Sequence, residues 1–264
     1  MKKAAFIGTG NMGSALIKAA CRGLGGDQVV IANRTFSKAE DLARETGCQA
    51  CAENREAAAA AEYIFLCVKP KMVRGVLEEL SQGLEGKVIV SVAAGVSLCD
   101  LQSWAGEGVP VLRIMPNTPC AIGKGMTALA GGISAKEKHF ADIEAILAET
   151  GRVERLEENL IDAFSALAGS GPAFVYPYIE ALADGGVAAG LPRAKAITYA
   201  AQTVLGAAAM VLETGEHPGK LKDDVCSPGG STIEGVWELE RRGLRAGAMD
   251  AVLAAWKKNG QLSK

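Results

Sequence analysis

The stretch Gly8-Thr9-Gly10-Asn11-Met12-Gly13 decides the fold of this 264-residue chain. It directly follows the apolar run at residues 4–7 and opens a helix-forming segment, the setting in which a glycine-spaced turn binds a dinucleotide. The first glycine permits the tight turn, the second lets the backbone approach a pyrophosphate, and the third permits close packing of helix on strand. The N–H groups and the positive end of the helix would bind the anion. A glycine-rich turn without a ligand stays open as the alternative.

Short apolar runs alternate with helical stretches downstream of this turn, to about residue 155. The strand-like runs lie at residues 4–8, 29–33, 48–51, 63–68, 88–92 and 109–115. Because they are continuously apolar, they indicate a parallel sheet covered on both faces. Ser37 and Glu40 have the capping-box spacing, which predicts a helix over about 37–46 that Gly47 ends.

The second half of the chain has a different pattern. Strand-like runs disappear, and alanine-rich helical segments follow at 157–168, 172–189, 192–213, 232–242 and 245–260. The sequence therefore predicts two domains, an α/β domain with a doubly wound sheet at residues 1–156 and an all-α domain at residues 157–264.

Composition excludes several classes of partner. The net charge is −2, so no basic field exists to attract nucleic acid or an anionic lipid surface. Two charge-free stretches, residues 163–179 and 196–212, fall just short of a membrane span. Because both are rich in alanine and glycine, we interpret them as helices buried between subunits, with a membrane span as the alternative.

Cysteine usage points to a reducing compartment. The seven cysteines are scattered and odd in number, which favours reduced thiols in a cytoplasmic protein over a disulfide framework. Cys48 and Cys51 have the spacing of a zinc pair, but no second pair accompanies them, so we expect packing residues and no metal. The apolar run before the first glycines is too short for a signal peptide, and we expect the mature chain to start at Met1.

The end of the second predicted strand selects the cofactor. An NAD site usually carries an acidic residue there, about 20 residues after the glycine turn, to accept from the ribose hydroxyls. This chain has Asn33-Arg34-Thr35 instead. A carboxylate would repel a 2′-phosphate, whereas Arg34 can pair with it through two hydrogen bonds. The residues favour NADPH, with NADH still possible.

Loops after the later strands complete the predicted cofactor rim, because ligands in open α/β sheets lie beyond the carboxyl ends of the strands. Val68-Lys69-Pro70, Ala93-Ala94 and Asn117 occupy these positions. Small residues and prolines allow the backbone to approach a flat nicotinamide, and Lys69 and Asn117 could contact its ribose or amide.

A second site is predicted in the helical half, at Ser227-Pro228-Gly229-Gly230-Ser231-Thr232. Consecutive glycines leading into a helix expose several N–H groups, and two hydroxyls follow them, so this loop suits a carboxylate. A flexible turn with a Ser or Thr N-cap is the alternative. The motifs contain no Ser-His-Asp set and no paired carboxylates, which fits reduction of an already protonated C=N bond that needs only alignment with a nicotinamide.

With these residues in view, the chain closely resembles the pyrroline-5-carboxylate reductases, which catalyse the last step of proline biosynthesis. The resemblance spans nearly the whole sequence and rests on residues 8–13, 33–35, 68–70, 115–119, 169–174, 184–186 and, most specifically, 217–230. It implies an oxidoreductase with a Rossmann-like N-terminal domain and a helical domain that forms a homodimer, often within a ring of dimers, with active sites shared between subunits.

The resemblance also implies roles for individual residues. Thr232 would face the ring nitrogen as the catalytic residue, and the substrate carboxylate would lie against Ser227, Gly229, Gly230, Ser231 and Thr232, although the side chain of Ser231 receives no specific role. Asn54 and the Val92-Ala93-Ala94 backbone join the cofactor contacts. The full predicted cofactor set is Ile7, Gly8, Thr9, Gly10, Asn11, Met12, Gly13, Asn33, Arg34, Thr35, Asn54, Val68, Lys69, Pro70, Val92, Ala93, Ala94 and Asn117.

Three rival functions are weighed from sequence, and two of them stay open. β-Hydroxyacid dehydrogenases share a glycine turn but are expected to carry a lysine on the long helix after their own glycine motif, and residues 171–180 contain none, which argues against alcohol oxidation. A different imine reductase is a second candidate. A catalytically silent NADPH-binding sensor is the third, although it would have no need of the 227–232 loop.

Overall fold

A computed structural model of the chain describes residues 1–262, which form two compact units. The first unit comprises Met1–Gly169 together with the C-terminal residues from Trp256, and the second comprises Ser170–Ala255. The domain boundary predicted between residues 156 and 157 falls inside the first unit.

The first unit is built on one eight-stranded sheet with the order β3-β2-β1-β4-β5-β6-β7-β8. All neighbouring strands are parallel except β6 and β7, which are antiparallel. The strands are β1 Lys2–Ile7, β2 Val29–Ala32, β3 Gln49–Cys51, β4 Ala61–Leu66, β5 Val88–Ser91, β6 Val111–Pro116, β7 Gly125–Gly131 and β8 Gly151–Arg155. The six predicted strands are present, and β7 and β8 were not predicted.

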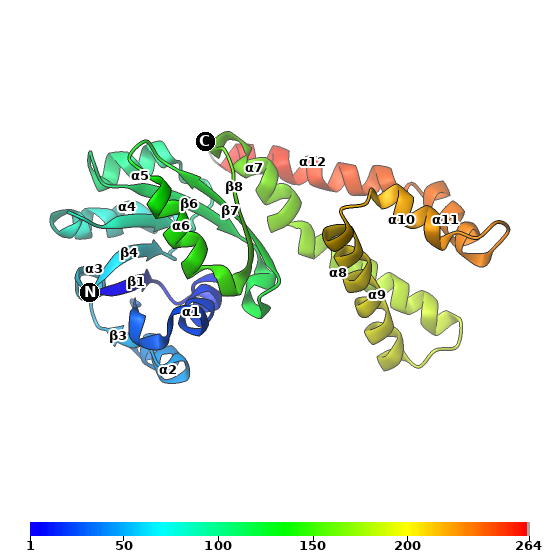
Figure 1. The fold of residues 1–264 in the computed structure, drawn as a ribbon, viewed down its shortest axis with the longest axis horizontal. Coiled ribbons are helices and arrows are strands. Elements are labelled where there is room, and N and C mark those ends of the chain that lie inside the picture. Colours follow the sequence, from blue (N-terminus) through cyan, green and yellow to red (C-terminus); the bar gives the residue numbers. More distant parts are fainter. Residues whose placement is uncertain (263–264) are drawn as a thin grey trace. The chain divides into compact units, whose positions relative to one another are not determined.

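Helices cover both faces of this sheet (Figure 1). Those of the first unit are α1 Asn11–Leu24, α2 Phe36–Thr46, α3 Asn54–Ala60, α4 Pro70–Leu80, α5 Leu98–Ala105, α6 Glu137–Ile146 and α7 Ile161–Phe164. Short 3-10 turns lie at Gly26–Gln28, Ser81–Gly83, Thr118–Ile122, Ala148–Thr150 and Glu158–Leu160, and a π-helical turn at Ser165–Gly169.

Two large apolar clusters show why the predicted strands are continuously apolar. One cluster packs α1, α2 and α6 on one face of the sheet, through side chains such as Leu16 and Ile143. The other packs α3, α4, α5 and α7 on the opposite face, through side chains such as Leu77 and Leu101. Because each central strand is buried on both sides, alternation with polar residues is lost.

The predicted start of α2 differs from the structure. The helix begins at Phe36 with Thr35 as its N-cap, and no side chain caps it, so the capping box expected at Ser37 and Glu40 is wrong. Gly47 ends the helix in a left-handed conformation at φ 73°, which confirms the predicted stop.

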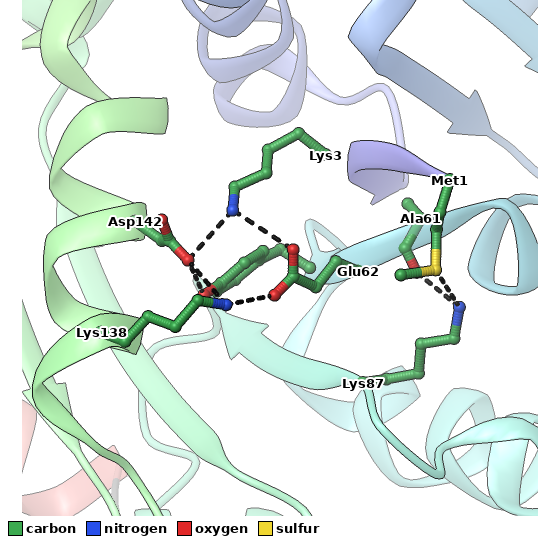
Figure 2. A network of polar contacts seen from close by, with 8 residues as sticks. Met1, Lys3, Ala61, Glu62, Lys87, Lys138 and Asp142 are labelled. Atoms are coloured by element: carbon green, nitrogen blue, oxygen red, sulfur yellow. Dashed lines mark hydrogen bonds and ion pairs between the residues drawn. The ribbon is translucent and has the colours of Figure 1, made fainter.

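A network of ion pairs lies at the amino-terminal ends of β1 and β4 (Figure 2). The Lys3 ammonium lies 3.2 Å from a Glu62 carboxylate oxygen and 3.0 Å from an Asp142 oxygen, and the Lys138 ammonium lies 2.7 Å from Glu62. The Tyr63 hydroxyl also donates to Asp142. The hydrogen bond from Lys138 holds the pKa of Glu62 below its ordinary value. This network ties β1, β4 and α6 together at the end of the sheet opposite the glycine turn.

The second unit is helical, with α8 Gly171–Ala188, α9 Arg193–Thr214, α10 Pro218–Val225, α11 Ser231–Arg241 and most of α12 Leu244–Leu262. Its buried apolar cluster consists of Ala183, Ala196 and Ala200, with Ile179 and Val187 packed against them. By contrast, many large apolar side chains are exposed, including Tyr176, Tyr199, Leu205, Met210, Leu212, Trp237, Met249 and Leu253. By length and composition alone, α9 could also cross a membrane.

Candidate functional site

The glycine turn joins β1 to α1 with three glycines in different environments. Gly8 has φ 106°, a conformation that side chains disfavour, and a Cβ on it would lie 2.5 Å from the Cys67 carbonyl oxygen. A Cβ on Gly13 would lie 2.3 Å from the Gly8 oxygen. A Cβ on Gly10, however, would meet no protein atom within 4 Å. Two of the glycines are therefore required by packing, while Gly10 leaves open space in front of the helix.

The first turn of α1 supplies hydrogen-bond donors to that space. The first helical bond runs from Ser14 N to Gly10 O at 2.7 Å, so the N–H groups of Asn11, Met12 and Gly13 have no acceptor within the helix. No acidic side chain lies in the first turn to occupy them. The start of α1 can therefore hold an anion.

Thr9 contributes less backbone to the site than the sequence predicts. Its N–H already donates to the Asn33 Oδ1 at 3.2 Å, so this group is not free for a ligand. Its hydroxyl oxygen is buried and has no hydrogen-bond partner among residues 1–262. A buried hydroxyl without a protein partner is costly, so this oxygen is available to a water molecule or to a bound ligand.

A cavity of about 420 Å³ opens beside the glycine turn and carries only positive charge. The charged residues in its lining are Arg34, Lys38, Lys69 and Lys71, and no Asp or Glu lines it. None of these four side chains has a hydrogen-bond or ion-pair partner in the described part of the chain. Most other arginines are paired, for example Arg44 and Arg74. The cavity therefore suits a ligand with several negative charges.

The cavity brings together much of the predicted cofactor set. Its predicted members are Ile7, Gly8, Thr9, Gly10, Asn33, Arg34, Thr35, Asn54, Val68 and Lys69. Those predicted members that do not line it are Asn11, Met12, Gly13, Pro70, Val92, Ala93, Ala94 and Asn117. Lys38 and Lys71 are additional cations that the sequence argument missed. Lys38 lies in the first turn of α2 and Lys71 in the first turn of α4, and neither turn contains an acidic residue. A lysine in an acid-free first helical turn is the sequence feature that could have predicted these two cations.

Several predicted rim residues are already bonded to the protein. Asn54 donates from Nδ2 to Glu79 at 2.9 Å, and the Ala93 N–H donates to the Ser91 hydroxyl at 3.2 Å. Asn117 is 9% exposed, donates from Nδ2 to the Ala168 oxygen at 2.9 Å and accepts from Met126 N at 2.9 Å. Both ends of the Asn117 amide are thus used to join β7 to the π-helical turn, so a contact with nicotinamide would compete with these bonds.

The loop at 227–232 forms a tight turn followed at once by α11. Gly230 N donates to Ser227 O at 3.0 Å, and Gly229 has φ 67°. Gly230 is the N-cap and makes no side-chain cap bond, so Ser231 and Thr232 are the first two residues of the helix. The alternative of a plain Ser or Thr N-cap is therefore wrong. Their exposed hydroxyls and the first N–H groups of α11 face no partner within residues 1–262.

Other side chains that attract attention have structural roles. His217 caps α10 by accepting from Gly219 N at 3.0 Å. Cys48 and Cys51 are buried, as predicted for packing residues. Within the described residues, no group of three or more His, Cys, Asp or Glu side chains is placed to hold a metal ion.

Two family models match the chain. One, described as pyrroline-5-carboxylate reductase dimerisation, matches residues 158–262, and the other, described as NADP oxidoreductase coenzyme F420-dependent, matches residues 3–95. The matches divide between the two halves of the sequence, and the second covers the glycine turn and all the residues that line the cation-lined cavity.

Relatives and solved structures resemble the chain over its length. The pyrroline-5-carboxylate reductase of Arabidopsis thaliana is 42% identical, covering 99% of this chain and 96% of that protein. The structure of a pyrroline-5-carboxylate reductase from Coxiella burnetii superposes with a TM-score of 0.93 at 32% identity, covering 100% and 99%. That of Plasmodium falciparum pyrroline carboxylate reductase with NADP bound has a TM-score of 0.88 at 28% identity, covering 100% and 98%.

Proposed function

The chain belongs to the pyrroline-5-carboxylate reductase family, and from this premise we propose that it reduces the cyclic imine 1-pyrroline-5-carboxylate to L-proline with NADPH. One observation within the chain carries the proposal. The same sequence combines a cavity lined by cations and by no acidic residue with a helix start, at α11, whose first N–H groups and hydroxyls have no partner within residues 1–262. The first suits a phosphate-rich dinucleotide, and the second suits a small carboxylate.

The lining of the cavity supports NADPH as the proposed cofactor in preference to NADH. The open space at Gly10 and the orphaned Thr9 hydroxyl are features that a bound pyrophosphate group would complete. A 2′-phosphate adds a charge of about −1.5 to −2 at neutral pH. Arg34 and Lys38 flank the start of α2, so two cations and a helix N-terminus are available for that charge. When bound, NADPH supplies the hydride.

At the α11 loop, the residues bind and orient rather than titrate. The N–H groups of Ser231 and Thr232 hold the substrate carboxylate, helped by the positive end of the helix. In this proposal the Thr232 hydroxyl would face the ring nitrogen and keep the imine aligned for hydride addition. Because the imine is bound in its protonated form, no side chain has to donate a proton during the reduction.

Assembly and location complete the proposal. The dimerisation match and the exposed apolar side chains of the helical unit support a homodimer, and we extend this to a ring of dimers with active sites shared between subunits. The seven cysteines are all free thiols, which supports a cytoplasmic location. The charge balance gives no reason to expect nucleic acid or a membrane as a partner.

The decisive experiment follows NADPH absorbance with purified protein and racemic pyrroline-5-carboxylate. An acyclic imine tests for a broader imine reductase, and a hydroxyacid assayed in the oxidative direction tests for a dehydrogenase. We expect turnover with the cyclic imine and little with the other two. NADPH binding without turnover of any substrate would favour a silent sensor, and preference for the hydroxyacid would overturn the proposal.

A further inference from the structure

The Asn33 side chain connects the glycine turn to the start of α2. Its Oδ1 accepts from the Thr9 N–H at 3.2 Å, and its Nδ2 donates to the Thr35 oxygen at 3.0 Å. Thr35 is the N-cap of α2, and the Lys38 N–H also donates to the Thr35 oxygen at 3.1 Å. One carboxamide therefore bonds to the backbone of two of the segments that line the cation-lined cavity, the glycine turn and the start of α2.

The register of the sheet puts Asn33 in this position. Ile7 pairs with Ala32 in the parallel β1–β2 ladder, and Gly8 N donates to the Ala32 oxygen at 2.8 Å. One residue further along, the two chains turn away toward α1 and α2, and the backbone ladder stops. The Asn33 side chain supplies the next acceptor, so it extends the connection between the two strands beyond their last backbone bond.

The two connected segments serve different parts of a dinucleotide under the proposed function. The glycine turn and the start of α1 face the pyrophosphate, whereas Arg34, Thr35 and Lys38 at the start of α2 face the 2′-phosphate. A single ligand that binds both segments requires them at a fixed separation. If one segment is displaced, the ligand cannot contact both at once and loses part of its binding energy. A side chain that fixes this separation would preorganise the cavity.

We propose that Asn33 is a positioning residue, a brace that sets the separation of the pyrophosphate and 2′-phosphate subsites, rather than a direct phosphate ligand. The inference rests on the proposed cofactor. Lys38 is the natural comparison, because it lines the same cavity, lies in the same first turn of α2 and has no protein partner for its ammonium group within residues 1–262. Lys38 acts directly on the phosphate, through its charge.

A fragment of the cofactor separates the two roles. Adenosine 2′-monophosphate fills only the 2′-phosphate subsite, so it does not require the correct separation from the glycine turn. Asn33→Ala should raise the Kd for NADPH roughly tenfold, since the two hydrogen bonds that fix the separation are lost. The Kd for the fragment should change by less than about twofold. Lys38→Ala should weaken both ligands by the same factor. Calorimetric titration of both ligands against the three proteins measures these ratios.

If Asn33→Ala loses affinity for NADPH and for the fragment by the same factor, Asn33 is a direct ligand and the inference is overturned. Unchanged NADPH affinity would overturn it as well. Asn33→Ser, whose hydroxyl cannot reach both partners, repeats the test if the alanine variant folds poorly. Amide hydrogen exchange adds a readout without any ligand: the Thr9 amide should exchange faster in Asn33→Ala, and unchanged protection would refute the brace. Normal NADPH binding by the parent without imine turnover would instead refute the proposed function alone.

Discussion

Gly13→Ala and Gly10→Ala should have different effects, the first on stability and the second on cofactor binding, although the two positions lie in one turn. At Gly13 the added Cβ would lie 2.3 Å from the Gly8 oxygen and 3.0 Å from the Cys67 Cβ. Both neighbours are held by the sheet, so the backbone itself must shift. Overpacking of this kind costs about 1–3 kcal/mol. At about 2–4 °C for each kcal/mol in a domain of this size, Gly13→Ala should lower the melting temperature by roughly 2–12 °C.

Gly10→Ala should leave the fold intact and weaken cofactor binding. Gly10 has φ −70° and ψ −179°, which alanine adopts without strain, and nothing lies within 4 Å of the new Cβ. Alanine is a weaker N-cap than glycine, which lowers the free energy of unfolding, but it also reduces the entropy of the unfolded chain, which raises that free energy. Each effect is about 1 kcal/mol or less, so they largely cancel. Gly10 lines the cavity at the start of α1, however, so the methyl group would occupy space that a bound anion needs. Losing one charge-assisted hydrogen bond, worth about 1.5–3 kcal/mol, would raise the Kd for NADPH roughly 10- to 150-fold.

Two measurements on each variant test this argument. Circular dichroism gives the melting temperature without ligand, and NADPH fluorescence titration gives the Kd. The expected pattern is a stability loss confined mainly to Gly13→Ala and a binding loss in Gly10→Ala at unchanged stability. If Gly10→Ala melts as early as Gly13→Ala, or binds NADPH as tightly as the parent, the reasoning from Cβ contacts is wrong.

Three further substitutions test separate parts of the molecule. Arg34→Asp should weaken NADPH more than NADH, because the new carboxylate repels the additional phosphate, and equal changes in the two Kd values would remove Arg34 from phosphate recognition. Thr232→Ala should lower kcat for imine reduction without raising the Kd for NADPH, whereas unchanged kcat would leave Thr232 without a role in the reaction. The depressed pKa of Glu62 makes its ionised form stabilising above an unfolded pKa of about 4.3, and this stability is lost as pH falls through the folded pKa. Urea unfolding should therefore show Glu62→Gln less stable than the parent at neutral pH and similar to it in acid, and a gap independent of pH would contradict the ion network.

The sequence predicted the parallel part of the sheet well, because strands buried on both faces are continuously apolar. It missed β7 and β8 for physical reasons that differ between them. β7 begins and ends with glycine, which is not typical of strands. Glycine is required at position 125 because a Cβ there would lie 2.2 Å from the Cys120 sulfur, and this contact exists only in the folded chain. β8 is a short edge strand with charged residues such as Arg152 and Arg155, so it lacks an apolar signal.

The site was predictable where a residue's neighbours in sequence set its role. The glycine turn and Arg34, which line the cavity, are of this kind, whereas the role given to the start of α11 stays a prediction. Lys38 and Lys71 were missed because they lie in different helices, and only folding places them around one cavity. The bonds of Asn117 to β7 and to the π-helical turn were equally hidden, because Ala168 lies 51 residues away in sequence.

The small alanine cluster of the helical unit has a thermodynamic consequence. Three buried alanines remove little apolar surface from water, too little to offset the chain entropy of the 86 residues from Ser170 to Ala255. In the homodimer proposed above, association would bury the exposed aromatic and aliphatic side chains of α8 to α12. Folding of this unit and assembly of the proposed dimer would then be one linked equilibrium, in which mass action sets how much of the unit is ordered. Its melting temperature should consequently rise with protein concentration, and dilution alone should loosen the helical unit first.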